Sequence, residues 1–429
     1  MKLFRLRRSF SLNAVFIYIA LFCVSTYALL EHTSIPISAF SSVKLPLMYV
    51  GFFCLVTQIR TIFRCLLKKH YFYMLLTLAL FCVLLIVSMF ANRNTLLGVS
   101  PLRHTVRLLL FLVELFLLMI VLAETGRGDS TLKFLFWYVL LIALINDGML
   151  LSRVLTFGSG KYENYLVGTK FSVSYIHMNL LTLWVIRGKW NGRGKWWGKL
   201  LILAMAAYIV ILSIRVDCMT GIIGCLALVI LNALLNSPKR NRLLRLTSAK
   251  VLLIVLLLSV IFAFIADSIV HIPFVEYVVE DVLGRDTTIT GRINIYEMYV
   301  NNMKDHWLSG FGYGNGNEAA VTLFGYENVQ NALLQWTLQV GIPATLGLVA
   351  VMYQVFNQIN RKNSKNMDKI LPLVSLIYTY ILLGTVETTF NMAFILWLAL
   401  IFMLVNEKKR VSIQRMAMPS SAENGETSV

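Results

Sequence analysis

Apolar runs of membrane-spanning length recur along the whole chain, and they constrain its fold more than any other feature. Each run is bounded by charged residues, Pro or Gly and approaches the ~20 residues that a transmembrane helix requires. The mean hydropathy is +0.72, and 58% of the 429 residues are hydrophobic while 14% are charged. Soluble domains have about 45–50% apolar and about 25% charged residues, so these values exclude a water-soluble globule. The twelve runs lie at 11–30, 43–59, 71–90, 105–123, 132–151, 171–186, 199–214, 218–235, 251–270, 329–357, 371–386 and 390–406.

These runs predict an all-α fold, a polytopic membrane helical bundle of about 12 transmembrane helices with one large extracytoplasmic loop. The tenth run contains Gly341-Ile342-Pro343, so we expect a kink or a break there. The predicted organisation is transmembrane helices 1–9 in 1–270, the extracytoplasmic loop in 271–328, transmembrane helices 10–12 in 329–406 and a cytoplasmic tail in 407–429.

The positive charge of the chain predicts its orientation. Lys and Arg outnumber Asp and Glu by 39 to 21, which gives a net charge of +18. Cytoplasmic loops of membrane proteins are enriched in Lys and Arg. Placing the N-terminus inside puts 28 of the 39 basic residues in cytoplasmic segments, so both termini are predicted to be cytoplasmic. The basic residues before the first run resemble a signal peptide, but Glu31-His32 replaces a small-residue cleavage site, which predicts a retained helix. Because topology accounts for most of the charge, no nucleic-acid partner is predicted.

The long loop carries two patterns. Residues 291–307 predict an amphipathic helix that lies on the membrane surface or on the bundle. The segment 310–316 is rich in glycine. No strand precedes it and no helix is expected directly after it, which argues against a nucleotide-binding loop. We predict instead a connector that brings backbone close to a ligand or to the bundle. The apolar stripe of the predicted helix consists of Ile295, Tyr296, Tyr299, Met303 and Trp307.

Four arginines on the predicted outer side are candidates for binding a diphosphate. Arg103 and Arg107 are four residues apart and therefore share a helix face. Arg215 ends the seventh run and Arg292 opens the loop helix. A guanidinium group matches phosphate oxygens geometrically and keeps its charge at every physiological pH. The alternatives are that each arginine reaches lipid headgroups or pairs with a carboxylate.

Carboxylates and histidines within or near the runs are the other candidates. Each of the carboxylates Glu114, Asp147 and Glu387 is a candidate to pair with an arginine. Glu387 lies at the predicted depth of the arginines, whereas a structural pair is expected for Glu114. His177 and His306 are read either as hydrogen-bonded packing residues or as site residues. The six cysteines form no Cys-x-x-Cys pair and no His-Glu-x-x-His motif occurs, so neither a metal site nor a cofactor is predicted.

Three motifs, in this order and spacing, resemble those of the O-antigen polymerase and O-antigen ligase superfamily, in particular the capsular repeat-unit polymerases. They are Val167–His177 with Lys170, Thr220-Gly221, and the stretch from Thr290-Gly291-Arg292 through Leu308–Gly314 to Gln330-Asn331-Ala332-Leu333-Leu334-Gln335. The sequence departs from the family at two positions. Gln330 stands where the family usually has a histidine on which ligases depend, and Met219 stands where the family has an arginine. Arg215 is one helical turn from Met219 and is expected to reach the same ligand.

The resemblance implies a metal-independent glycosyltransferase in the bacterial cytoplasmic (inner) membrane. Its substrate would be a polyprenyl-diphosphate-linked oligosaccharide, and its partners would be membrane lipid, a chain-length regulator and a flippase. An acceptor hydroxyl would displace the lipid diphosphate at the outer membrane face, with Glu387, His306 or Glu327 as general base. The catalytic candidates are Arg292, Arg215, Glu387 and His306, and the substrate-binding candidates are Arg103, Arg107, Gln330, Asn331, His177 and Lys170.

Two alternatives to a repeat-unit polymerase remain open at this stage. An O-antigen ligase would transfer finished polysaccharide to another acceptor. A lipid-linked oligosaccharide flippase would also need a cationic cavity, but it would be expected to show repeated halves and cations along a path through the bundle. The sequence shows no internal repeat, and its candidate cations gather on the predicted outer side.

Overall fold

The computed structural model describes residues 12–30, 38–93, 100–152, 165–188, 196–235, 244–270, 272–273, 277, 292–362 and 366–408. Within these residues the chain is helical and contains no β-strand, which confirms the all-α prediction. Every predicted apolar run coincides with a helix. These helices are α1 (Leu12–Leu29), α2 (Ser38–Val56), α4 (Lys69–Ala91), α5 (Pro101–Glu124), α6 (Gly128–Leu151), α7 (Lys170–Gly188), α8 (Trp196–Arg215), α9 (Met219–Leu235), α11 (Ala249–Val270), α15 (Ala332–Lys362), α16 (Met367–Leu383) and α17 (Met392–Asn406).

Judged by length and composition, the described helices provide fewer membrane spans than the sequence has apolar runs. Six described helices are long and apolar enough to cross a membrane, or seven if α2 and the following α3 (Ile59–Leu66), bent by 74°, form one span. Shorter apolar helices include α9 and α17. The 15 residues of α17 rise only about 22 Å at 1.5 Å per residue, less than the ~30 Å hydrocarbon core. A multi-span membrane protein is supported, and the count of twelve spans stays a prediction.

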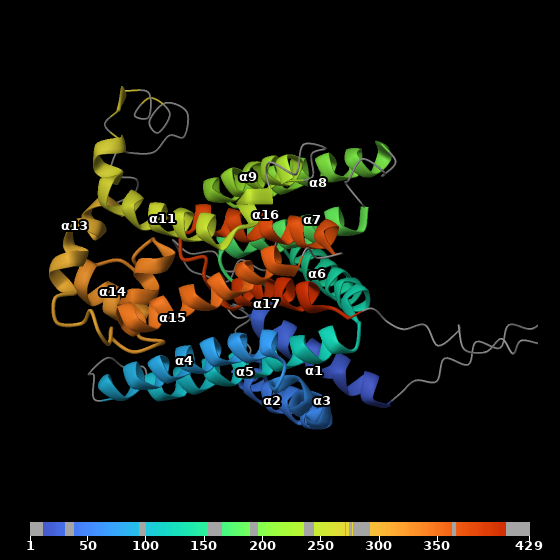
Figure 1. Ribbon diagram of the computed structural model, residues 1–429. Helices are drawn as coiled ribbons and strands as arrows, with labels where there is room; N and C mark the ends of the chain where they lie inside the picture. The colour runs from blue at the N-terminus through green and yellow to red at the C-terminus, as the bar shows by residue number, and fades with distance from the viewer. Residues whose placement is uncertain are drawn as a thin grey trace, which may run out of the picture.

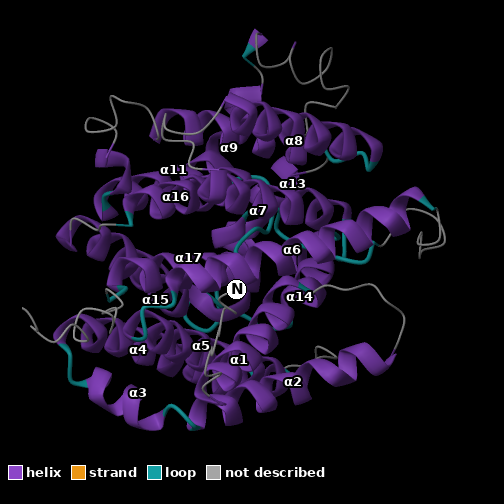
Figure 2. Ribbon diagram, turned by 90° about the vertical axis from the view of Figure 1, so that its right-hand side faces the viewer, coloured by secondary structure: helices purple, strands orange, loops and turns teal. Residues whose placement is uncertain are grey.

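Helix α17 forms the centre of the bundle. All of its residues from Met392 to Asn406 are buried, as expected for a helix that is apolar on every side. It packs against α1, α5, α15 and α16. Figures 1 and 2 both show α8 and α9 along one side of the bundle and α2 and α3 along the opposite side, with α17 between them.

The two ends of the bundle differ. Figure 1 shows α13 (Arg292–Asn302) and α14 (Gly316–Phe324) at the left end, which we call the loop end, whereas α1 begins at the right end, which we call the terminal end. The predicted amphipathic helix is present as α13, but it ends at Asn302 and not at Trp307. Its stripe residues Ile295, Tyr296 and Tyr299, together with Met303 in the following turn, are buried in a cluster with residues of α11, α14 and α15. Burial raises the pKa of the Tyr299 phenol, which stays neutral and donates a hydrogen bond to the Leu334 carbonyl at 2.8 Å.

The glycine-rich segment packs tightly on the bundle. This is one of the two placements predicted for it, close to a ligand or close to the bundle. Gly310, Gly312 and Gly314 all have positive φ, a conformation that L side chains rarely adopt. A Cβ atom on Gly310 would lie 2.6 Å from the backbone between Gln339 and Val340. The expectation that no helix follows directly was wrong, because α14 begins at Gly316. This helix has nine residues, too few to give a clear periodic pattern in the sequence.

The predicted kink in α15 is present at Gly341, whose φ of 77° and ψ of 170° are not helical. The break lets the turn after α13 dock beside the helix. Ile342 N donates to the Trp307 carbonyl at 2.8 Å, and Phe311 N donates to the Leu338 carbonyl at the same distance. The glycine-rich segment and the broken start of α15 therefore form one packed unit at the loop end.

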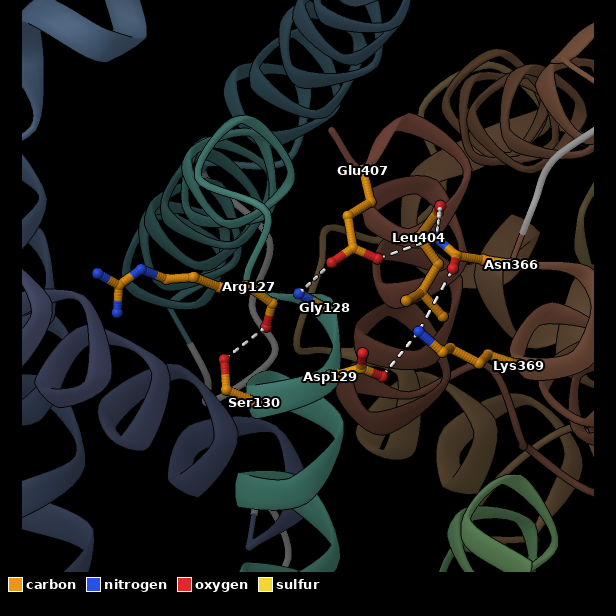
Figure 3. Close-up of polar contacts among 8 residues, drawn as sticks. All are labelled: Arg127, Gly128, Asp129, Ser130, Asn366, Lys369, Leu404 and Glu407. Atoms are coloured by element: carbon orange, nitrogen blue, oxygen red, sulfur yellow. Dashed lines mark hydrogen bonds and ion pairs between the residues drawn. The ribbon is translucent and has the colours of Figure 1, made fainter. Parts of the chain in front are cut away.

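Polar contacts hold the helices together at the terminal end (Figure 3). The Glu407 carboxylate accepts from the Gly128 backbone N–H at 2.6 Å and from the Asn366 amide at 2.9 Å, and this links the end of α17 to the starts of α6 and α16. A carboxylate at a helix N-terminus also complements the helix dipole. Nearby, a hydrogen bond to Glu124 raises the pKa of the Lys408 ammonium.

Candidate functional site

A cavity of about 430 Å³ lies at the loop end, where the ends of several helices meet. This volume falls within the roughly 300–1,000 Å³ of small-molecule sites. Its walls come from the end of α1, the starts of α2, α5 and α15, the glycine-rich segment, and the connection between α16 and α17. The lining residues are Tyr27, Lys44, Leu45, His104, Arg107, Tyr313, Gly314, Gly316, Asn317, Ala332, Gln335, Trp336, Gln339, Thr388, Phe390 and Asn391.

Two cationic side chains line the cavity. Arg107 and Lys44 line it from α5 and α2, and both side chains are half-buried. The Arg107 Nε atom is buried without a hydrogen-bond partner in the described part of the chain. An unsatisfied buried donor costs about 1–3 kcal/mol, and a charged group costs more. Such a group is therefore poised to gain stabilisation from an anionic ligand.

Amide and aromatic side chains also line the cavity. The Gln335 Oε1 atom accepts from Val329 N at 2.9 Å, and the Gln339 Oε1 atom accepts from Gly314 N at 3.2 Å, so the backbone fixes both side chains. An amide whose oxygen is occupied still has an NH₂ group to donate. The rings of Tyr313 and Trp336 pack with centroids 5.6 Å apart. Fixed donors beside aromatic faces suit a polar ligand with apolar C–H faces, such as a sugar.

Among the four arginines that are candidates for binding a diphosphate, Arg107 is the one whose described side chain lines the cavity. Arg103 is exposed one turn earlier on α5. Arg215 is exposed at the end of α8 and lines neither this cavity nor a smaller one of about 30 Å³ beside α7. Arg292 begins α13, and its side chain lies outside the described residues. The shared role predicted for Arg215 and Arg292 therefore stays a prediction.

The other candidate catalytic residues do not line the cavity. Glu387 is buried immediately before the lining residue Thr388. His306 stacks on Phe311 with ring centroids 4.0 Å apart. Glu327 lies in the connection between α14 and α15. Their catalytic roles stay predictions.

Gln330 and Asn331 position the start of α15. The fully buried Asn331 accepts from the backbone N–H groups of Leu333 and Leu334 at 3.1 Å each, and so caps the helix. Its amide also donates to the Ser259 carbonyl at 3.1 Å. Gln330 has a positive φ of 56°, and its carbonyl accepts from the Tyr296 hydroxyl at 2.9 Å. These contacts give both residues a structural role beside the cavity.

Lys170 and His177 belong to a different region, around α7. Lys170 pairs with the exposed Asp217 at 3.3 Å. His177 is buried, with Nδ1 2.7 Å from the Val173 carbonyl and Nε2 3.0 Å from the Asp147 carboxylate. Because a carbonyl oxygen only accepts, Nδ1 donates to Val173, and Nε2 is left to pair with Asp147. Both ring nitrogens are thus occupied within the protein.

We expect Tyr208→Phe to destabilise this buried network without affecting catalysis. The Tyr208 hydroxyl donates to Asp147 at 2.8 Å, and losing a hydrogen bond to a charged group costs about 1–3 kcal/mol. Thermal unfolding in detergent should show a lower midpoint than for Tyr73→Phe, which alters an exposed tyrosine on α4. Reduced activity at an unchanged unfolding midpoint would argue for a direct role of the network in the reaction.

Sequence reasoning missed several lining residues, above all Lys44, His104, Gln339 and Asn391. Lys44 could have been identified from the sequence, because it is a charged residue inside an apolar run. His104 lies between two predicted arginines on the same helix, but its approach to the glycine-rich segment depends on tertiary packing. No three His, Cys, Asp or Glu side chains in the described ranges are placed to share a metal ion.

Comparison with known proteins agrees with the motifs. Residues 201–349 match a family model described as O-Antigen ligase. The matched segment runs from α8 through the glycine-rich segment into α15, and it confirms the resemblance to the O-antigen polymerase and ligase superfamily. The match does not separate polymerases from ligases. Searches of curated proteins and of solved structures gave no match.

Proposed function

We propose that this protein joins polyprenyl-diphosphate-linked oligosaccharide repeat units into a surface polysaccharide, either capsule or O-antigen. The observation that carries the proposal is the cavity at the loop end, whose wall holds the Arg107 Nε atom without a hydrogen-bond partner among the described residues. The family match supplies the reaction class, that of glycosyltransferase-like enzymes of polysaccharide synthesis. A cavity lined by cationic, amide and aromatic side chains fits a ligand with a diphosphate next to sugars.

In the proposed reaction, an acceptor sugar hydroxyl attacks the anomeric carbon of the donor as the bond to the lipid diphosphate breaks. Negative charge grows on the bridging oxygen, and fixed cations that face this oxygen lower the barrier. Arg107 and Lys44 supply the charge in the cavity, and the chemistry uses it in place of a metal ion. The amide groups of Gln335 and Gln339 orient the sugars, which contributes through proximity.

The polymerase is favoured over an O-antigen ligase by Gln330, which occupies the position of the family histidine and cannot accept a proton. It is favoured over a flippase by the position of Lys44, His104 and Arg107 around a single cavity at the loop end, rather than along a path through the bundle. We place the protein in the bacterial inner membrane with both termini in the cytoplasm. A flippase that delivers repeat units and a chain-length regulator are the proposed partners.

Purified protein mixed with synthetic polyprenyl-diphosphate repeat units tests this function. A polymerase produces a ladder of products on a gel, each longer by one repeat unit. In cells, deletion of the gene should leave single repeat units displayed outside. Repeat units trapped inside would indicate a flippase, and full-length chains that are not joined to their final acceptor would indicate a ligase.

A further inference from the structure

We propose that His104 is the general base of the reaction, an inference that rests on the proposed function. His104 lines the 430 Å³ cavity from the first turn of α5. It lies three residues before Arg107 and therefore on the same face of the helix. The positively charged wall and an imidazole thus face the same space.

His104 is the lining side chain suited to accept a proton. The other ionisable groups in the wall are Lys44 and Arg107, which are cations at neutral pH, and the phenols of Tyr27 and Tyr313. Arg103 on the same helix is also cationic and exposed. Glu318 and Glu387 each stand next to a lining residue in the sequence, but neither lines the cavity. A neutral imidazole has one nitrogen free to take a proton.

The glycine-rich segment holds the imidazole in place. A Cβ atom on Gly314 would lie 2.5 Å from His104 Cγ and 3.0 Å from its Cδ2, so only glycine fits against the ring. Gly314 also has a φ of +96°, which favours glycine independently. The contact uses carbon atoms of the ring, and no described residue hydrogen-bonds to either ring nitrogen. The ring is therefore positioned while its nitrogens stay available.

In the proposed step, the acceptor hydroxyl forms a bond to the anomeric carbon and its proton passes to His104. The bond from that carbon to the diphosphate oxygen breaks, and the lipid diphosphate leaves with the electron pair beside Arg107. His104 then releases the proton to water. This assignment gives the protein a base on α5, in place of the histidine that the family carries at the position of Gln330.

The test compares wild type, His104→Gln and His70→Gln in the assay with synthetic polyprenyl-diphosphate repeat units, across a range of pH. His70 is at the start of α4, near the terminal end, so its replacement is a matched control. General-base catalysis contributes about 10²–10⁴-fold, so His104→Gln should lower kcat by that factor with little change in KM. The loss of rate on the acid side, where the imidazole becomes protonated, should disappear from the kcat/KM profile of the variant.

A second variant separates proton transfer from packing. His104→Ala leaves space in the cavity wall, and added imidazole should restore part of its rate with a dependence on the neutral form of imidazole. A wild-type rate in His104→Gln, or a lower rate that keeps the acid limb and is not rescued by imidazole, would overturn the assignment while the polymerase function stands. Failure of wild type to extend any repeat unit would overturn both proposals.

Discussion

Replacing Arg107 with glutamine is expected to lower the rate of polymer formation by about 10²–10³-fold, the usual loss when one group that stabilises developing negative charge is removed. Arg107 is the half-buried cation that lines the candidate cavity, and its buried Nε atom lacks a partner in the described part of the chain. Glutamine keeps much of the length and can donate hydrogen bonds, but it carries no charge. The measurement is the single-turnover rate with a synthetic lipid-diphosphate repeat unit.

The same substitution should leave the stability of the free protein unchanged or raise it. A buried donor without a partner destabilises the folded state, and glutamine carries no charge to bury. Arg93→Gln is the matched control, because Arg93 is exposed beyond the end of α4 at the loop end. A lower unfolding midpoint for Arg107→Gln, together with a rate equal to that of Arg93→Gln, would show that Arg107 has a structural role.

Gly341→Ala is expected to produce the largest loss of stability, at least about 3 kcal/mol. The φ of 77° and ψ of 170° at Gly341 lie in a region that is essentially restricted to glycine. A Cβ atom there would lie 2.3 Å from the Leu308 carbonyl oxygen, which belongs to backbone and cannot rotate away. The turn that carries Tyr313 and Gly314 into the cavity would lose its support on α15, so activity should fall as well.

Gly325→Ala isolates the cost of a left-handed backbone conformation from the cost of the steric clash expected in Gly341→Ala. Gly325 ends α14 with a φ of 75°, but no atom lies within 4 Å of the position of an added Cβ. Its replacement should cost only the strain of a left-handed residue, about 1–2 kcal/mol. Thermal unfolding in detergent should therefore rank wild type above Gly325→Ala and both above Gly341→Ala. Equal midpoints for the two variants would contradict the tight packing at Gly341.

The helices were largely predictable from sequence, because a long apolar segment has few alternatives to a helix in a membrane. The short helices α3 and α14 were not predicted. Arg60 and Arg64 made α3 resemble a charged loop, and α14 has only nine residues. The kink at Gly341 and the buried stripe of α13 were both predicted, since each depends on local residue types and spacing.

The site was predictable only in part. Arg107 was identified by its charge and its predicted side, and the structure places it in the cavity wall. Asn331 stood out in the Gln330–Gln335 motif, and its observed contacts are those of a helix cap. Lys44, His104 and Gln339 come from three helices that are distant in the sequence, so their convergence depends on how the helices pack. Local pattern predicts elements well, but it does not predict which helix ends meet.

Photo-crosslinking tests the central claim that the cavity at the loop end binds a lipid diphosphate. A photoreactive polyprenyl-diphosphate analogue would be bound to the purified protein, irradiated, and its attachment sites identified by mass spectrometry. The proposed site predicts attachment to peptides that contain Lys44, Arg107 or Tyr313, with competition by unlabelled donor and loss in Arg107→Gln. Attachment confined to the end of α8 around Arg215, unaffected by Arg107→Gln, would contradict the assignment of this cavity.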